Sequence, residues 1–501
     1  MEADLSGQVP GKKWFGHPCG LATLFFTEMW ERFSYYGMRA LLVLFMAATA
    51  AETNPGLEFD VTMSTAVYGL YTFFVYVLAL PGGWVADNLW GQRKAVFVGG
   101  CIIALGHFTM ALPVIGLPDV PCFFLGLMFI VIGTGLLKPN VSTMVGDLYP
   151  EGGARRDAGF SIFYMGINLG AFVGPLLTGA LGEGYNWHLG FSLAGVGMVL
   201  GLIQYKLGEK YLGDAGTLQT DDDETTLAAR TRKFYYVAGG AFVTMAVGGY
   251  LILQVVSLAT LATWLGYGVI VLAVLYFAYL LIAGGHTNLE KRRLVVIFWI
   301  FILAAVFWSG FEQAGSSMNL FAATLTDRVV FGWEAPASWL QSVNALFIII
   351  LAPVFGSLWI WLASRNANPS IPVKFSLGLL GLAGGFFVLA WGAANASSDN
   401  LVTPAWLIVT YFLHTCGELC LSPVGLSSIT KLAPKGRVGQ MMGVWFIGAA
   451  LGNLFAGLVA GRLETLAPSA LFGNVAMIIG AAGVIALLLS PPVRKIMGDV
   501  E

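Results

Sequence analysis

The sequence predicts an all-α polytopic membrane protein with fourteen membrane-spanning helices. Of its 501 residues, 57% are hydrophobic and only 11% are charged, whereas a soluble domain carries about a quarter charged residues. The hydrophobic residues form runs long enough to cross a bilayer, which takes roughly 20 residues per helix. A net charge of −2 gives no reason to expect a nucleic-acid partner.

The predicted spans follow one another with short separators along most of the chain. They cover residues 21–48, 62–86, 94–115, 121–146, 158–182, 188–206, 234–256, 261–284, 294–324, 338–364, 373–394, 402–430, 438–461 and 468–490. The longest separator, 207–233, is charged and is interpreted as a solvated linker. We therefore predict a six-helix bundle at 1–207, a linker with an extra two-helix hairpin at 208–290, and a second six-helix bundle at 291–501.

The charges of the loops predict the orientation of the chain. Most of the 26 Lys and Arg residues lie in alternate loops, for example Arg93 and Lys94, whereas the opposite set contains only Arg328 and Arg462. The positive-inside rule then places both termini in the cytoplasm. The first twenty residues are polar and lack a signal-peptide core, so insertion is expected through the spans themselves.

Seven Glu, Lys and Arg side chains are expected to lie within the hydrocarbon, away from the ends of the spans. They are Glu28, Glu31, Arg32, Arg39, Lys138, Glu312 and Glu418. Each costs about 3 kcal/mol at the centre of a membrane helix, so seven unpaired would cost about 20 kcal/mol, more than the net stability of a typical domain. They must therefore face one another or water, and four acids against three bases leave one acid able to hold a proton.

The first span carries most of these charges on one face. At about 100° per residue, Glu28, Glu31, Arg32, Tyr35 and Arg39 fall within a stripe about 100° wide, which can face a cavity. Ion pairs that only hold helices together are the alternative. We consider it weaker, because fixed ion pairs can be replaced by apolar packing without loss of stability.

Other polar residues in the spans have less specific signals. Asn168 and Asn344 can bind a polar ligand or join helices. Glu418 precedes Pro423 and follows His414 by four residues, but no third metal ligand is visible, so no metal site is predicted. Asp87, between the second and third spans, is interpreted as a gating and structural residue that caps a helix and pairs with Arg93 or with a neighbouring helix end.

The run from Glu28 to Gly37, EMWERFSYYG, matches the ExxERFxYY motif of the proton-dependent oligopeptide transporter family. The segments that also resemble this family are 83–96, 133–149, 158–171, 307–316, 339–355 and 414–434. Within the first, 83–94 resembles the loop signature of the major facilitator superfamily, to which the family belongs. The hairpin at 234–284 is similar to the extra helices of bacterial members. The resemblance implies the major facilitator fold in a bacterial di- and tripeptide transporter.

The resemblance also implies roles for individual residues. Glu28, Glu31, Arg32, Lys138 and Glu312 would couple transport to protons, with Glu312 facing Arg39. The peptide carboxylate would lie near Arg39 and Lys138, and its amino group near Glu418. The remaining residues implied in peptide binding are Tyr35, Tyr36, Tyr76, Asn168, Asn344, Ser422, Trp445 and Phe446. Animal members have a histidine on the second helix, but residues 61–86 contain none, so proton handling is expected to rest on carboxylates.

A bipolar cavity suits a zwitterionic peptide, which carries a carboxylate and an ammonium group at its two ends. The expected function is therefore proton-coupled symport of di- and tripeptides into the cytoplasm by alternating access, by a monomer in the bacterial inner membrane. Protons are the coupling ion, and neither a cofactor nor a catalytic residue is expected. A relative that carries nitrate or another small solute is the main alternative, which the acidic Glu418 disfavours. An intramembrane enzyme is a second alternative, but the sequence shows no nucleophile–base pair. A passive channel is a third, and uphill uptake would exclude it.

Overall fold

Helices make up nearly all of the described chain, because a backbone in lipid must satisfy its hydrogen bonds internally. The computed structural model describes residues 13–434 and 436–498, without the side chains of residues 246 and 250. The predicted cytoplasmic positions of the two termini concern residues 1–12 and 499–501, which lie outside the described residues.

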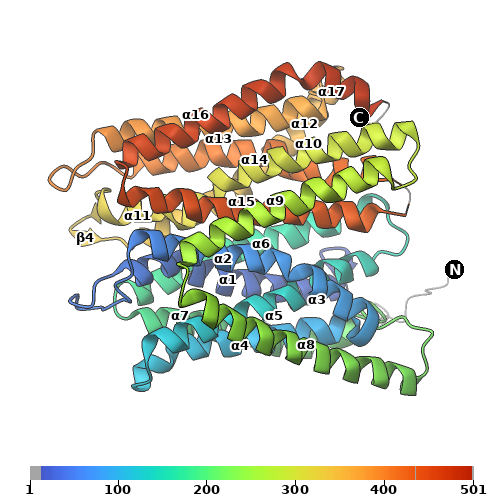
Figure 1. Cartoon of the computed structure of the whole chain (residues 1–501), viewed down its shortest axis with the longest axis horizontal. Coiled ribbons are helices and arrows are strands. Elements are labelled where there is room, and N and C mark those ends of the chain that lie inside the picture. Colours follow the sequence, from blue (N-terminus) through green and yellow to red (C-terminus); the bar gives the residue numbers. More distant parts are fainter. Residues whose placement is uncertain (1–12, 435, 499–501) are drawn as a thin grey trace. The chain divides into compact units, whose positions relative to one another are not determined.

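Figure 1 labels the elements in chain order. The first part of the chain contains β1 (Lys13–Trp14), β2 (His17–Pro18), α1 (Cys19–Ala47), α2 (Val61–Val77), α3 (Ala79–Val85), the π-helical turn η1 (Ala86–Trp90), α4 (Gly91–Ala111), η2 (Leu112–Ile115), α5 (Asp119–Asp147), α6 (Gly153–Gly182), α7 (Trp187–Gly208) and η3 (Glu209–Tyr211). The predicted hairpin is α8 (Glu224–Leu253) and α9 (Leu258–Ile282). The remainder contains α10 (Asn288–Phe311), η4 (Glu312–Gly315), α11 (Ser317–Thr324), β3 (Val329–Val330), β4 (Trp333–Glu334), η5 (Ala337–Gln341), α12 (Ser342–Ser364), α13 (Ile371–Ala394), α14 (Ala405–Leu432), α15 (Val438–Ala460), η6 (Gly461–Glu464), α16 (Pro468–Leu488) and α17 (Ser490–Met497).

The fourteen predicted spans are confirmed within the described residues. Twelve helical stretches there are long and apolar enough to cross a membrane, and one of them, Val61–Ile115, contains two predicted spans. The charged helix α1 is the remaining span. Three details differ from the prediction. The second span is divided at Leu78, the span at 294–324 is broken after Phe311, and α8 begins within the supposed linker, at Glu224.

The described chain divides into two compact units, and the boundaries between them fall inside α1, α2, α6, α7 and α9. The first unit contains residues up to Gly37, Val77–Gly174 and His188–Leu261, and the second contains Met38–Tyr76, Pro175–Trp187 and the chain from Ala262 onward. The domain boundaries expected at residues 207 and 290 therefore stay a prediction.

Close helix packing in the first unit depends on glycine. A Cβ at Gly99 on α4 would lie 2.6 Å from Gly133 O on α5, and a Cβ at Gly126 on α5 would lie 2.7 Å from Gly106 O on α4. Small residues let membrane helices approach to backbone contact, which compensates for the weak hydrophobic drive between helices in lipid. Residues of α4 and α5 are thus held in fixed register.

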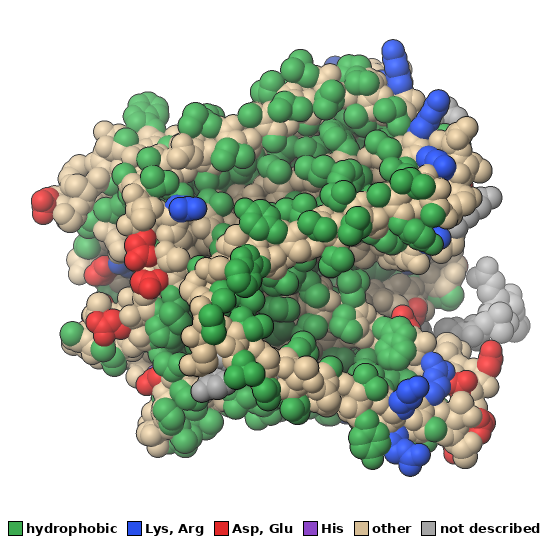
Figure 2. All heavy atoms as spheres, viewed as in Figure 1, with side chains coloured by type: hydrophobic (Ala, Val, Ile, Leu, Met, Phe, Trp, Pro, Cys, Tyr) green, Lys and Arg blue, Asp and Glu red, His purple; other side chains and the backbone are tan. Residues whose placement is uncertain are grey.

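In the second unit, α13 packs between α14 and α16, and α10 packs against α15 (Figure 1). The start of α10 is fixed by a capping box, in which Thr287 and Glu290 each satisfy the backbone N–H of the other. Figure 2 shows hydrophobic side chains along the visible faces of α8 and α16, and Lys and Arg side chains near one end of α8 and around α17. This distribution is typical of helices whose middles face lipid and whose ends reach water.

Candidate functional site

The charged stripe of α1 forms a buried ion cluster in the first unit. Arg32 Nε lies 2.9 Å from Glu28 Oε1 and 2.5 Å from Glu31 Oε2. The exposed fractions of Glu28, Glu31 and Arg32 are 3%, 0% and 3%. Neither carboxylate oxygen of Glu31 has a well-aligned hydrogen bond among the described residues. Arg32 therefore balances the charge of Glu31 mainly by proximity and not by aligned hydrogen bonds.

Neighbouring elements fix the position of this cluster. Gly170 of α6 packs against it so closely that a Cβ there would lie 2.2 Å from Met29 O and 2.9 Å from Arg32 Cβ. The guanidinium carbon of Arg32 lies 5.3 Å from the centre of the Tyr35 ring, a cation–π contact. Lys138, on α5 next to Pro139, is close enough to Glu31 to interact electrostatically. The structure thus brings the expected residues of this group together.

A second ion pair lies in the second unit, where α10 breaks. Arg39 Nη2 lies 3.1 Å from Glu312 Oε2, and both side chains are buried. Glu312 begins the short 3-10 turn η4 between α10 and α11. Broken membrane helices occur where the backbone is buried in protein or lines a polar cavity. The Tyr68 hydroxyl supports the break by donating a hydrogen bond of 3.2 Å to Glu312 O.

Glu418 of α14 differs from the other buried carboxylates because it makes no ion pair with any residue that the structure describes. Its Oε2 is 3.5 Å from Asn344 Nδ2, and the same amide donates a hydrogen bond of 2.9 Å to Thr415 Oγ1. Glu312 is close enough to add negative potential at Glu418, and only 9% of Glu418 is exposed. The surroundings of Glu418 therefore favour a cation or a proton.

The remaining predicted residues are placed as follows. Tyr36 packs edge-on against Tyr35 in the first unit, where Asn168 Nδ2 donates a hydrogen bond to Tyr164 O of its own helix. In the second unit, Trp445 is 5% exposed and packs against Gly425 and Phe375. Partly exposed side chains belong to Tyr76, Asn344, Ser422 and Phe446.

Several partners of the buried polar residues were not predicted from the sequence. Tyr68 and Thr415, the hydrogen-bond partners of Glu312 and Asn344, could not be singled out because each is only a polar residue in a predicted span. The break at Glu312 could have been indicated by Gly310 and Gly315, which flank it. Asp87 does not pair with Arg93, the first of the two partners expected for it, and its partner lies instead in the first turn of α4. Asp87 accepts a hydrogen bond from Gln92, and Arg93 donates to the carbonyl oxygens of residues 213 and 215, because the loop after α7 packs beside the start of α4.

A family model for the POT family matches residues 93–472, which is most of the chain. The chain belongs to the POT family. Because members of this family are transporters, this member is a multi-pass membrane transporter and not an enzyme.

The similarity extends over whole chains. A peptide transporter of Yersinia enterocolitica is 42% identical, over 98% of this chain and 97% of the relative. A di-/tripeptide transporter of Lactococcus lactis is 34% identical, over 98% of both chains. The crystal structure of a peptide transporter in complex with sulfate shares 41% identity over 98% of both chains, with a TM-score of 0.88. This POT family member therefore has the major facilitator fold.

Proposed function

We propose that this protein is a proton-coupled symporter that imports di- and tripeptides across the bacterial cytoplasmic membrane by alternating access. The observation that carries the proposal is Glu418, a buried carboxylate without an ion pair among the described residues. A buried charge is costly unless it is paired. The ammonium group of a peptide supplies the missing partner.

The second unit offers both poles that a zwitterionic peptide needs. Glu418, with Asn344 beside it, would bind the amino group. Arg39 would bind the carboxylate once protonation of Glu312 ends its ion pair with that residue. Substrate and proton are then coupled directly, because the proton on Glu312 makes Arg39 available.

The cluster on α1 supports a second proton-dependent step. Glu31 shares Arg32 with Glu28 and is under the influence of Lys138. Protonating Glu31 would weaken its hold on both basic residues and change the balance between conformations. One proton moving across 100 mV supplies about 2.3 kcal/mol, enough for roughly fifty-fold accumulation of a neutral substrate.

Relatives agree with a substrate that has an amino and a carboxyl group. The similar transporters of Yersinia enterocolitica and Lactococcus lactis are described as carriers of peptides or of di- and tripeptides. A POT family transporter that is 34% identical has been solved with 5-aminolevulinic acid and with a conjugated peptide. Transport of nitrate or another small anion is disfavoured, because Glu418 would repel it.

The test is uptake of labelled dialanine into proteoliposomes with an imposed proton gradient. We expect accumulation to depend on the gradient, to collapse with a protonophore, and to be inhibited by unlabelled dipeptides but not by nitrate. Gradient-independent accumulation would exclude proton coupling, and inhibition by nitrate alone would exclude peptides. The same preparation, made from the purified protein alone, tests the further expectation that no cofactor is needed.

A further inference from the structure

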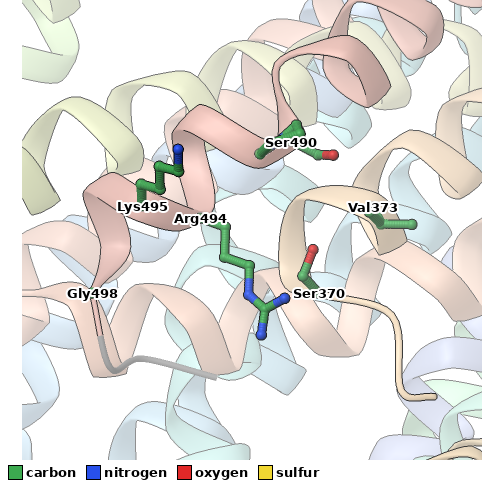
Figure 3. Close-up of a pocket in the computed structure, with 7 residues that line it drawn as sticks. Ser370, Val373, Ser490, Arg494, Lys495 and Gly498 are labelled. Carbon is green, nitrogen blue, oxygen red and sulfur yellow. The ribbon is translucent and has the colours of Figure 1, made fainter. Parts of the chain in front are cut away.

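A surface pocket between α17 and the start of α13 has no role in the proposed transport cycle. It has a volume of about 810 Å³ and is lined by Ser370, Val373, Ser490, Arg494 and Lys495, among others. In Figure 3, Arg494 extends from α17 toward Ser370, whereas Lys495 points away from it. No lining residue that the structure describes is acidic, and Arg494 and Lys495 bring two basic side chains to the lining.

Hydrogen-bond donors of the pocket suit an anion. Ser370 is the N-cap of α13, but its side chain makes no capping hydrogen bond. Pro372 has no backbone N–H, so the first turn offers the N–H groups of Ile371 and Val373, which have no partner within the helix. Ser490 is only 7% exposed. Its hydroxyl makes no hydrogen bond within the described part of the chain, although it lines the pocket. A guanidinium group, two serine hydroxyls and a helix N-terminus are ligands typical of phosphate sites.

The position of the pocket favours a phosphate that belongs to a lipid. α17 follows the membrane-spanning helix α16 directly, and it buries Val493 and Met497 while its last turn carries Arg494 and Lys495. Leu488, two residues before Ser490, and Leu377, one helical turn after Val373, are 72% and 41% exposed, which leaves apolar surface for acyl chains. The loop charges place this end of α16 at the cytoplasmic side, where anionic lipids interact with basic pockets between helices.

We propose that this pocket binds the phosphate group of an anionic phospholipid headgroup. Arg494 and the start of α13 contact the phosphate, Lys495 adds to the local positive potential, and Leu377 and Leu488 contact the acyl chains. The site is separate from Glu418 and Arg39, so it holds a lipid that regulates or stabilises the transporter and not a transported solute.

Binding of phosphatidylglycerol to the full chain in neutral detergent, measured by native mass spectrometry against phosphatidylcholine, tests the proposal. We expect preference for phosphatidylglycerol, a loss of roughly tenfold in its affinity for Arg494→Gln, and a smaller loss for Lys495→Gln. Arg494→Lys should retain most of the affinity because it keeps the charge. Arg232→Gln is the distant control, since Arg232 is exposed on α8, and it should bind like wild type.

Several results would overturn the proposal. They are equal binding of the two lipids, equal losses in Arg494→Gln and Arg232→Gln, and displacement of the lipid by millimolar inorganic phosphate, which would make this a site for the free ion. The chain ends with the acidic residues Asp499 and Glu501, outside the described residues. A double variant with Asp499→Asn and Glu501→Gln should bind the lipid at least as tightly, and loss of binding there would also contradict the proposal.

Discussion

Glu418 combines burial with the lack of an ion-pair partner among the described residues. We expect Glu418→Gln to lower dialanine affinity by roughly thirty-fold or more, because removing one member of a desolvated charge pair costs about 2–5 kcal/mol. An analogue without the amino group, propionyl-alanine, should bind the wild type weakly and lose little further affinity in the variant. Both affinities are measured as the inhibition of labelled dialanine uptake by the unlabelled ligand.

The control is Glu224→Gln, which removes the same charge from an exposed position on α8. It should transport both ligands like the wild type. If Glu418→Gln weakens both ligands equally, Glu418 does not bind the amino terminus.

Glu31 separates proton coupling from substrate binding. Glutamine keeps the shape and much of the hydrogen bonding of Glu31 but cannot exchange a proton. We expect Glu31→Gln to retain peptide-for-peptide counterflow without a proton gradient, since that mode needs only binding and loaded reorientation. Proton-driven uptake should fall to near background. Both rates are measured in proteoliposomes and normalised to reconstituted protein.

Glu151→Gln serves as the control for this variant, because Glu151 is a solvent-exposed glutamate with a side chain 58% exposed. It should keep both transport modes. A parallel fall of both modes in Glu31→Gln would mean that Glu31 only stabilises the fold, and full proton-driven uptake would remove Glu31 from the mechanism.

At the scale of elements, the ends of helices carry much of the polar chemistry in the second unit. Glu312 lies where α10 gives way to η4. Glu183, just after α6, accepts hydrogen bonds from the backbone N–H groups of Ala337 and Ser338 at 2.8 and 3.0 Å and from the Ser338 hydroxyl. One carboxylate thereby joins the end of α6 to the start of η5.

The contact at Glu183 should make stability depend on pH. Burial raises the pKa of Glu183 above its ordinary value near 4.5, despite opposing contributions from Ser338, Ala337 and the nearby Arg328. The folded state therefore keeps this proton to higher pH than the unfolded state. The contribution of Glu183 to the free energy of unfolding is full below pH 4.5 and falls as pH rises through the folded pKa.

Thermal unfolding of the wild type and of Glu183→Gln between pH 4.5 and 8 measures this effect. Glutamine is always neutral, so the melting temperature of the wild type relative to the variant should fall as pH rises. The difference between the two proteins removes the contributions of other groups that titrate. If the difference in melting temperature does not change with pH, burial does not raise the pKa of Glu183.

At the scale of the whole molecule, the loop charges predict which ends of the helices face the cytoplasm. We expect Ser398→Cys, between α13 and α14, to react with a membrane-impermeant thiol reagent in intact cells. Gln219→Cys, before α8, should react only after permeabilisation. The unmodified chain, with its five native cysteines, gives the background. The opposite labelling pattern would reverse the predicted topology.

Much of the fold was predictable because lipid imposes simple rules on a chain. A span needs a long apolar run, and Lys and Arg residues bias the loops toward one side. The fourteen spans follow from these rules. The break after Phe311 and the division at Leu78 did not. Gly310 and Gly315 flank the first and Pro81 follows the second, but Gly and Pro also occur within continuous membrane helices.

The sequence by itself determined that Glu28, Glu31 and Arg32 share one face of α1, since the helical repeat places them there. It also determined that the charged residues of the spans need partners, because an isolated charge in lipid is costly. Only the tertiary structure decided the pairing, with Arg39 bound to Glu312 and Glu418 left beside Asn344. Partners from distant helices depend on how those helices pack, which is set by contacts such as Gly170 against α1 and not by local spacing.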